Sequence, residues 1–458
     1  MSEKSLKSVH ITNYYHKNSG GISNSYNRLL EAANRHQRFV RLIVPGATSE
    51  VEEVGEYGRI YYVQANSSPV FDRRYRIMLP WKTYLHVESP IRKILLSEMP
   101  DIIEISEKYS LSLLAGIIRM GHFSRLGRPM LVHFTCERMD DNMRSFVADG
   151  AFFRWFARRV MGYYNFPMFD FHIGNSDYTA QELLDSVSAN ENPHRSKAFL
   201  NFCWRYFHAA RTPISERVFV SPRGVDTVLY TDARKSFELR REILAALGFP
   251  PDAAVILYAG RISPEKNVEL LPQTMRLLSL DARRDYRLVI AGDGPQRESL
   301  IKELERQAQD KFKFLGHVTD KEQLANLYAN ADVFVHPNPR EPFGIAPLEA
   351  MASATPVVAP NAGGILTYAT PENCWLTQPT AAEFASAIQN VFADAARTAT
   401  KVAHALRTAR SFTWDISNDQ LFGLYDQMYE DFERRRELYA YSIEPKEINF
   451  VSELLTEN

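Results

Sequence analysis

Short apolar runs alternate with helix-like segments along nearly the whole chain, and this alternation restricts the fold more than any other feature. Short apolar runs bounded by turn residues are typical of buried strands, and helices between them connect parallel strands. We therefore predict an α/β protein with doubly wound parallel sheets. The predicted strands are 8–11, 39–43, 60–63, 102–105, 130–134, 171–175 and 218–220, then 254–259, 287–291, 312–315, 333–335 and 356–359.

The length of 458 residues is too great for one ordinary core and predicts two or three domains. A new strand-helix series begins after the stretch 227–239, which follows the turn Pro222-Arg223-Gly224. We expect Rossmann-like domains at 1–226 and 240–427, with a crossover helix and tail at 428–458 returning to the first domain. Ligands of such sheets bind outside the carboxyl ends of the strands, so a cleft between the domains is the expected site.

Composition excludes several classes of protein. A formal net charge of −1 argues against a nucleic-acid partner. The cysteines Cys136, Cys203 and Cys374 are too far apart for a metal site and too few for a disulfide framework. The first residues lack the apolar core of a signal peptide, and no run of about twenty apolar residues occurs. These observations predict a cytoplasmic protein.

The segment 336–364, HPNPREPFGIAPLEAMASATPVVAPNAGG, carries most of the chemistry. Glu341 is expected on a strand-to-helix loop, Gly344 at the helix entrance and Glu349 inside the helix. A helix N-terminus binds anions through free backbone N–H groups. A carboxylate near that end repels a phosphate unless it faces neutral groups such as sugar hydroxyls. The segment therefore predicts a nucleotide-sugar site.

Two cations follow the predicted strand 254–259. Arg261 comes directly after Gly260, and Lys266 is five residues further on. An arginine fork and a lysine point charge suit a diphosphate leaving group. The alternative is an ordinary solvated start of a helix. The glycines at Gly20-Gly21 and Gly292 lie on loops after strands, but neither forms the GxGxxG pattern of a dinucleotide dehydrogenase.

Together these residues resemble the retaining glycosyltransferases of family 4, which have two Rossmann-like domains in the GT-B arrangement. The resemblance covers nearly the whole chain, and the spacing of Glu341 and Glu349 with the upstream pair is its most specific part. Its motifs are Gly20-Gly21, Pro100-Asp101-Ile102-Ile103, Arg223-Gly224-Val225-Asp226, Gly260-Arg261 with Lys266, residues 291–295, Gly316-His317-Val318, residues 341–352 and Phe412-Thr413-Trp414-Asp415.

The resemblance implies a role for each matching residue. Arg261 and Lys266 would hold the donor diphosphate, Glu341 the sugar hydroxyls and Glu349 the nucleotide ribose. The catalytic set would be His133, Glu341, Arg261 and Lys266, with His133 beside the reacting sugar carbon. The remaining donor-binding residues would be Gly20, Gly21, Gly260, Gly292, His317, Val318, Phe343, Gly344 and Ile345.

These roles predict a retaining, metal-independent hexosyltransferase with no required cofactor. It would transfer a sugar from a UDP- or GDP-linked donor to an acceptor hydroxyl, in glycolipid, polysaccharide or glycoside biosynthesis. The alternatives are a nucleotide-sugar epimerase or hydrolase on the same architecture and a non-catalytic sugar-nucleotide-binding module. The donor base, the sugar, the acceptor, its linkage and the oligomeric state stay open.

Two segments are candidates for membrane contact, and two positions depart from the family pattern. The segments 152–166 and 199–211 mix basic and aromatic residues. They either lie on anionic lipid, which would place the protein peripherally on the inner face of a membrane, or have aromatic core residues with arginines at the edge. Ala354 and Arg223 replace a glycine and an asparagine that are usual in the family. The Ala354 methyl group is expected to tighten helix packing slightly.

Overall fold

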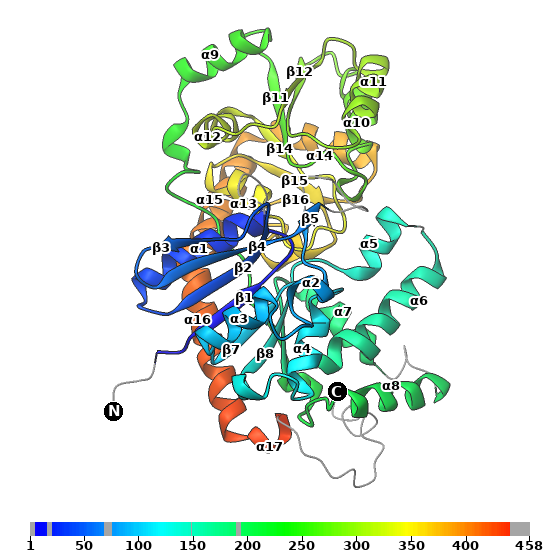
Figure 1. Cartoon of the computed structure of the whole chain (residues 1–458). Helices are drawn as coiled ribbons and strands as arrows, with labels where there is room; N and C mark the ends of the chain where they lie inside the picture. Colours follow the sequence, from blue (N-terminus) through cyan, green and yellow to red (C-terminus); the bar gives the residue numbers. More distant parts are fainter. Residues whose placement is uncertain (1–4, 16–20, 68–75, 148, 189–193, 440–458) are drawn as a thin grey trace. The chain divides into compact units, whose positions relative to one another are not determined.

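The computed structural model describes residues 5–15, 21–67, 76–147, 149–188 and 194–439 (Figure 1). The chain forms two compact units: unit 1 contains Met1–Ser221 and Ser417–Asn458, and unit 2 contains Pro222–Ile416. The chain therefore passes between the units twice, at 221/222 and at 416/417. The domain boundaries predicted from the sequence lie somewhat later in the chain, between residues 226 and 240 and at 427/428.

Unit 1 is built on an eight-stranded sheet of order β10-β9-β8-β7-β1-β2-β4-β3. All neighbouring strands are parallel except β3 and β4, which are antiparallel. The strands are β1 Ser8–Ile11, β2 Val40–Gly46, β3 Glu50–Val54, β4 Gly58–Gln64, β7 Ile102–Ile105, β8 Met130–Thr135, β9 Phe171–Gly174 and β10 Val218–Val220, and a separate pair is formed by β5 Asn66–Ser67 and β6 Arg76–Ile77.

Helices cover this sheet and close its two cores. One core contains Val9, Ile11 and Ile43, and the other contains Val40, Leu42 and Val44, because successive side chains of a strand point to opposite faces. The helices are α1 Gly21–Arg35, α2 Pro80–Thr83, α3 Pro90–Glu98, α4 Ser112–Arg119, α5 Met139–Phe146, α6 Ala151–Val160, α7 Asp177–Val187, α8 His194–Tyr206, α16 Trp414–Arg434 and α17 Arg436–Tyr439.

The C-terminal helix α16 returns to unit 1, as expected. Its side chains Leu421, Phe422, Tyr425, Met428 and Phe432 belong to the core that also contains α1 and β2 residues. The Tyr425 hydroxyl donates a hydrogen bond to the buried carboxylate of Glu104. This polar contact and the apolar packing attach the end of the chain to the sheet formed by its beginning.

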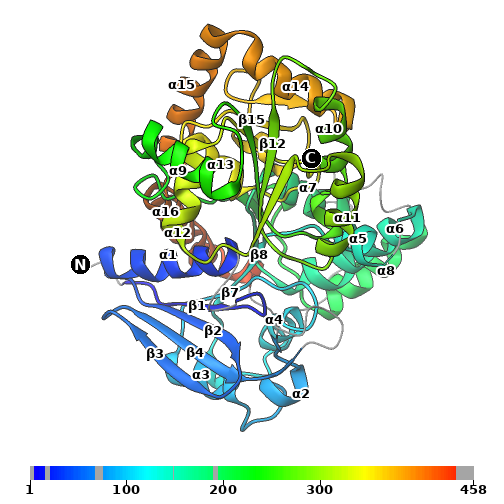
Figure 2. The same cartoon turned by 90° about the horizontal axis from the view of Figure 1, so that it is seen from above.

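Unit 2 is built on a six-stranded parallel sheet of order β13-β12-β11-β14-β15-β16 (Figure 2). The strands are β11 Ala254–Ala259, β12 Tyr286–Ala291, β13 Phe312–Gly316, β14 Val333–Val335, β15 Val357–Pro360 and β16 Trp375–Thr377. The helices are α9 Phe237–Leu247, α10 Leu270–Leu278, α11 Arg297–Gln307, α12 Lys321–Asn330, α13 Ile345–Ala352, α14 Ala381–Ala393 and α15 Ala395–Ser411. Along β11, Val255 and Leu257 enter one core while Ile256 and Tyr258 enter the other, so both faces are buried.

Gly224 lies where the two chain crossings meet inside unit 2. The Val225 amide donates to the Phe412 carbonyl at 2.7 Å. A Cβ atom at position 224 would lie 2.5 Å from the backbone nitrogen of Trp414. This close approach of two backbones explains the glycine at this position.

These features confirm the predicted fold class. Every predicted strand overlaps an observed one, and both main sheets are parallel apart from one edge pair. None of the helices in the described ranges has the length and apolar character needed to cross a membrane.

Candidate functional site

The carboxyl ends of β11, β12 and β13 meet at a tight glycine junction in unit 2. The Gly260 amide donates to the Ala291 carbonyl at 3.0 Å, and the Gly292 amide donates to the Gly316 carbonyl at 2.7 Å. A Cβ atom at position 292 would lie 1.8 Å from the Gly260 carbonyl oxygen. Gly260 and Gly292 therefore lie together, and Gly292 has a packing reason that does not require a ligand.

The loop after β11 carries the two predicted cations. Its path is fixed by the Tyr258 hydroxyl, which donates to the Arg261 carbonyl at 2.8 Å, and by the Asn267 amide, which donates to the Pro337 carbonyl at 3.0 Å. The second bond attaches the loop to the segment that follows β14. Because β11 and β14 are parallel neighbours, their carboxyl ends place Lys266 beside Glu341.

Glu341 and Lys266 form an ion pair at the entrance of α13. The Lys266 ammonium lies 2.7 Å from Glu341 Oε2 and 3.0 Å from Oε1. The Asn338 side-chain amide donates to Oε2 at 2.9 Å, and His336 Nε2 lies 3.4 Å from it. The carboxylate therefore faces a cation and an amide, not only neutral groups as the sequence argument expected.

The pKa of Glu341 reflects this environment. Burial favours the neutral carboxyl, but the charge of Lys266 and the hydrogen bonds from Lys266 and Asn338 outweigh it and lower the pKa to about 2. Burial also lowers the pKa of His336 to about 4, so its imidazole is neutral at physiological pH. The site thus presents an ionised carboxylate with fixed partners over a wide pH range.

His336 and Asn338 were not predicted as site residues. Both are buried, with 6% and 2% of their surface exposed, and both contact Glu341. Their signal in the sequence is two polar residues in HPNP between a buried strand and Glu341.

Gly344 turns the chain into α13. Its φ of +86° lies in the left-handed region that favours glycine. The backbone N–H groups of Ile345 and Ala346 have no acceptor within the helix. The Tyr368 hydroxyl donates to the Gly344 carbonyl, and the Phe343 ring packs 5.3 Å from the Tyr368 ring. Phe343 therefore has a buried side chain.

The other end of α13 is shaped by Ala354. This residue has a φ of +55° and lies just after the helix, with 6% of its surface exposed. Its methyl group therefore acts mainly through backbone strain, because L-residues with side chains disfavour this region. The sequence predicted that this methyl group tightens helix packing slightly, whereas the structure indicates that its main effect is the energetic cost of a left-handed backbone.

Glu349 lies on α13 beside two tyrosines. The rings of Tyr230 and Tyr328 meet edge to face at 5.4 Å. Burial raises the pKa of Glu349 to about 7, against the opposing influence of both tyrosine hydroxyls and Lys321. Ionisation of Glu349 is therefore costly unless donors are supplied to it, as the hydroxyls of a ribose would do.

The predicted residues of unit 1 are arranged differently. His133 is fully buried inside β8, with its ring 5.1 Å from that of Phe169 and 5.5 Å from that of His172. Burial lowers its pKa well below the ordinary value, and Lys108 adds to this. Strand β8 continues to Thr135, so His133 is not at the strand end expected from the sequence. Gly21 is the exposed first residue of α1, and Gly20 lies outside the described residues.

Two other positions lie at the end of β13. His317 is exposed and Val318 is partly buried directly after Gly316. Among the described residues, no group of three or more His, Cys, Asp or Glu side chains is placed to hold a metal ion, and metal independence stays a prediction.

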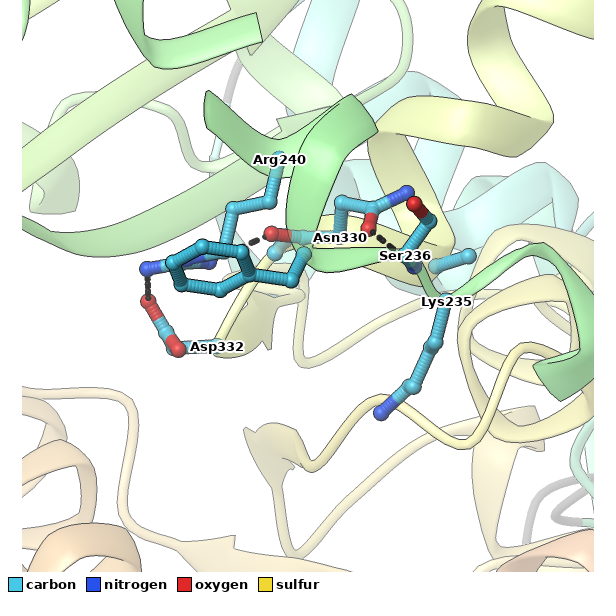
Figure 3. A pocket seen from close by; sticks show the side chains of 8 residues that line it. Lys235, Ser236, Arg240, Asn330 and Asp332 are labelled. Atoms are coloured by element: carbon cyan, nitrogen blue, oxygen red, sulfur yellow. Dashed lines mark hydrogen bonds and ion pairs between the residues drawn. The ribbon is translucent and has the colours of Figure 1, made fainter. Parts of the chain in front are cut away.

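Two surface cavities of unit 2 lie outside this set of residues. One, of about 310 Å³, is lined by Lys235, Ser236, Phe237, Arg240 and residues 329–332 (Figure 3). Its charged groups already pair with protein, since Arg240 binds Asp332 at 2.7 Å and Lys235 binds the Ala354 carbonyl at 2.7 Å. The other, of about 340 Å³, is lined by residues that include Tyr368, Asn373 and His404. Neither contains a predicted site residue.

Comparisons with known proteins find similar sequences and structures. Residues 240–408 match the family model described as glycosyl transferases group 1. The chain is 26% identical over 414 residues to a GDP-mannose-dependent alpha-(1-6)-phosphatidylinositol dimannoside mannosyltransferase of Mycobacterium tuberculosis, covering 89% of this chain and 93% of the relative.

Solved structures share the fold over most of the chain. A sucrose-phosphate synthase from Thermosynechococcus elongatus has a TM-score of 0.67 at 21% identity, covering 93% of this chain and all of that one. The HepE protein of Anabaena, crystallised with UDP and glucose, has a TM-score of 0.64 at 18% identity, covering 92% of this chain and all of that one. Over residues 240–408 the chain therefore matches the glycosyl transferases of group 1, and over most of its length it shares the GT-B fold of these solved structures.

Proposed function

We propose that the protein is a retaining hexosyltransferase that takes its sugar from a nucleoside diphosphate donor, with GDP-mannose as the first candidate. The observation that carries the proposal is the Lys266–Glu341–Asn338 cluster at the start of α13. It combines a cation, a carboxylate and free helix N–H groups, which are the groups that a diphosphate and a polyhydroxylated sugar require. The GDP-mannose dependence of the mycobacterial relative supports the choice of donor.

In the proposed reaction, Lys266 and Arg261 bind the diphosphate together with the N–H groups of α13. Glu341 accepts hydrogen bonds from the sugar hydroxyls, and Glu349 accepts them from the ribose. Lys266 then exchanges part of its contact with Glu341 for phosphate oxygens. Because charge on the diphosphate grows as the glycosidic bond breaks, these cations stabilise the transition state more than the bound donor.

The proposed bond changes need no protein nucleophile. The bond between the anomeric carbon and the phosphate oxygen breaks, and its electron pair stays on the diphosphate. An acceptor hydroxyl attacks the same face, and its proton passes to a departing phosphate oxygen. The configuration at the anomeric carbon is then retained. Neither a metal ion nor a cofactor takes part in these steps.

We propose a glycolipid carrying inositol or mannose as the acceptor class, at a peripheral position on a membrane. The support is the full-length similarity to an enzyme whose name gives a phosphatidylinositol dimannoside as acceptor. An epimerase or hydrolase on the same architecture is the competing reading, and it differs by consuming donor when no acceptor is present.

Two measurements test this proposal. GDP-mannose should raise the thermal unfolding temperature more than UDP-glucose, since a ligand that binds only the native state stabilises it by mass action. Lys266→Ala and Glu341→Ala should each lower the transfer rate by roughly 100-fold or more. Lys302→Ala, an exposed change on α11, is the matched control. Transfer rates near wild type in both site variants would refute the donor site, and donor consumption without acceptor would favour the alternative.

A further inference from the structure

Helices α6 and α8 of unit 1 expose a concentration of aromatic side chains. Among the described residues, eight large aromatic side chains are exposed, and six of them lie on these two helices. They are Phe152, Trp155 and Phe156 on α6 and Phe199, Phe202 and Tyr206 on α8, with 43–64% of their surfaces accessible. Elsewhere in the described part of unit 1 only Trp81 is comparable. Such a concentration marks an interaction surface.

The exposed rings occupy one face of each helix. On α8, Phe199, Phe202 and Tyr206 follow helical spacing, while Leu200 and Trp204 point into the core and are fully buried. The alternative in which the aromatics are core residues therefore holds for Trp204 but not for the outer row of Phe199, Phe202 and Tyr206.

A continuous series of ring contacts joins the two helices. Trp155 stacks on Phe152 at 5.9 Å, and the Arg159 guanidinium lies 5.0 Å from the Trp155 ring and 5.8 Å from the Tyr163 ring. The Tyr163 ring meets the Phe199 ring edge to face at 5.1 Å. Phe199, Phe202 and Tyr206 continue the series at 6.3 and 6.2 Å. Figures 1 and 2 show α6 and α8 beside each other, in agreement with these contacts. We call the six exposed side chains Phe152, Trp155, Phe156, Phe199, Phe202 and Tyr206 the aromatic ridge.

The charges on both helices have one sign. The ranges of α6 and α8 contain no aspartate or glutamate, and they contribute Arg154, Arg158, Arg159, Lys197 and Arg205. Asp149, just before α6, pairs with Arg144 at 2.9 Å and with Arg154 at 3.5 Å. A second copy of this face would therefore bring cations against cations, whereas an anionic bilayer supplies both the apolar layer and the opposite charge.

We propose that the aromatic ridge is a membrane-docking surface that binds anionic phospholipid bilayers in the interfacial plane. The aromatic rings enter the boundary between headgroups and acyl chains, and the exposed side chains of Arg154 and Arg205 contact lipid phosphates. This binding does not depend on the donor site of unit 2, so it can be measured without turnover.

Vesicle flotation of the full-length protein tests the proposal. The wild type should float with phosphatidylcholine vesicles that contain phosphatidylglycerol, and roughly ten-fold less with phosphatidylcholine alone; added salt should weaken the binding. Phe199→Ser with Phe202→Ser, and separately Phe152→Ser with Trp155→Ser, should each lower partitioning by roughly ten-fold or more. Phe237→Ser is the matched control, since this ring is 71% exposed in unit 2.

The thermal unfolding temperature of each variant shows whether it folds like the wild type. Arg154→Glu provides a second, purely electrostatic variant and should weaken binding to the anionic vesicles. The proposal is overturned if the wild type ignores anionic vesicles or if the folded ridge variants float as it does. It is also overturned if the ridge variants instead dissolve a dimer in sedimentation experiments, because the surface would then bind a second copy.

Discussion

Replacing Lys266 by Met tests the ion pair at the centre of the proposed site. Burial opposes the ionisation of Glu341, yet Lys266, His336 and Asn338 hold its pKa at about 2, whereas its ordinary value is 4.5. This difference corresponds to roughly 3 kcal/mol of stabilisation at neutral pH. Lys266 makes the largest favourable contribution, but about a quarter of its side chain is exposed and water screens part of it. We expect Lys266→Met to lower the free energy of unfolding by about 1–2 kcal/mol at pH 7.

The pH dependence has a definite sign. A carboxyl group with a depressed pKa in the native state contributes its full stabilisation above the unfolded-state pKa and loses it as the pH falls through the native value. For Glu341 this window extends from about 4.5 down to about 2. The difference between the wild type and Lys266→Met in urea unfolding should therefore be largest near neutral pH and shrink below pH 4.5, while Lys302→Met should unfold like the wild type throughout.

The double variant Lys266→Met with Glu341→Gln separates stability from activity. It leaves no unpaired buried charge, so it should recover most of the stability lost in Lys266→Met. Sugar transfer should stay low, because the groups proposed to bind the diphosphate and the sugar are gone. The pair does not stabilise unit 2 if Lys266→Met unfolds at the same urea concentration as the wild type. The same conclusion follows if the stability lost in the double variant equals the sum of the losses in the two single variants.

Three further predictions concern single positions. Ala354→Gly should raise the free energy of unfolding by about 0.5–1 kcal/mol in urea titration. The glycine relieves about 1–2 kcal/mol of left-handed backbone strain in the native state, and the greater conformational entropy of the unfolded glycine chain offsets only part of this gain. Unchanged or lower stability contradicts this. Gly292→Ala should lower the melting temperature and donor binding, since its Cβ would meet the Gly260 carbonyl at 1.8 Å, whereas Gly423→Ala, with open space, should not; equal melting of both variants contradicts the packing argument. Glu349→Gln should stabilise the protein more at pH 8 than at pH 6. Burial raises the pKa of Glu349 to about 7, so ionisation of this carboxyl lowers the stability of the wild type as the pH rises from about 4.5 through 7. A difference in melting temperature between wild type and variant that does not change with pH rejects this.

Many of the strands that the sequence revealed, such as β8, β11 and β14, are buried on both faces. Runs such as 254–259 and 333–335 are continuously apolar because helices cover both sides of a parallel sheet. Strand β3, with the sequence EVEEV, was not predicted. It is an exposed antiparallel edge strand, so its side chains carry no buried pattern, and only its pairing with β4 makes it a strand.

The candidate site shows a similar division. Residue type and spacing were enough to select Lys266, Glu341 and Glu349, because a diphosphate and sugar hydroxyls need cations and carboxylates near a helix entrance. The partners of those groups were not predictable. His336 and Asn338 contact Glu341, and Tyr230 and Tyr328 surround Glu349, through pairings that depend on the path of the backbone.

The sequence by itself determined the fold class, the position of the glycine-rich turns and the residue types of the proposed donor site, because burial periodicity and turn chemistry are local properties of the chain. Only the tertiary structure decided that His133 is enclosed by Phe169 and His172, that Ala354 has a left-handed backbone, and that the outer rings of α6 and α8 face solvent. The physical reason is that exposure, charge pairing and backbone strain depend on which distant segments pack together, and adjacent residues in the sequence do not specify those contacts.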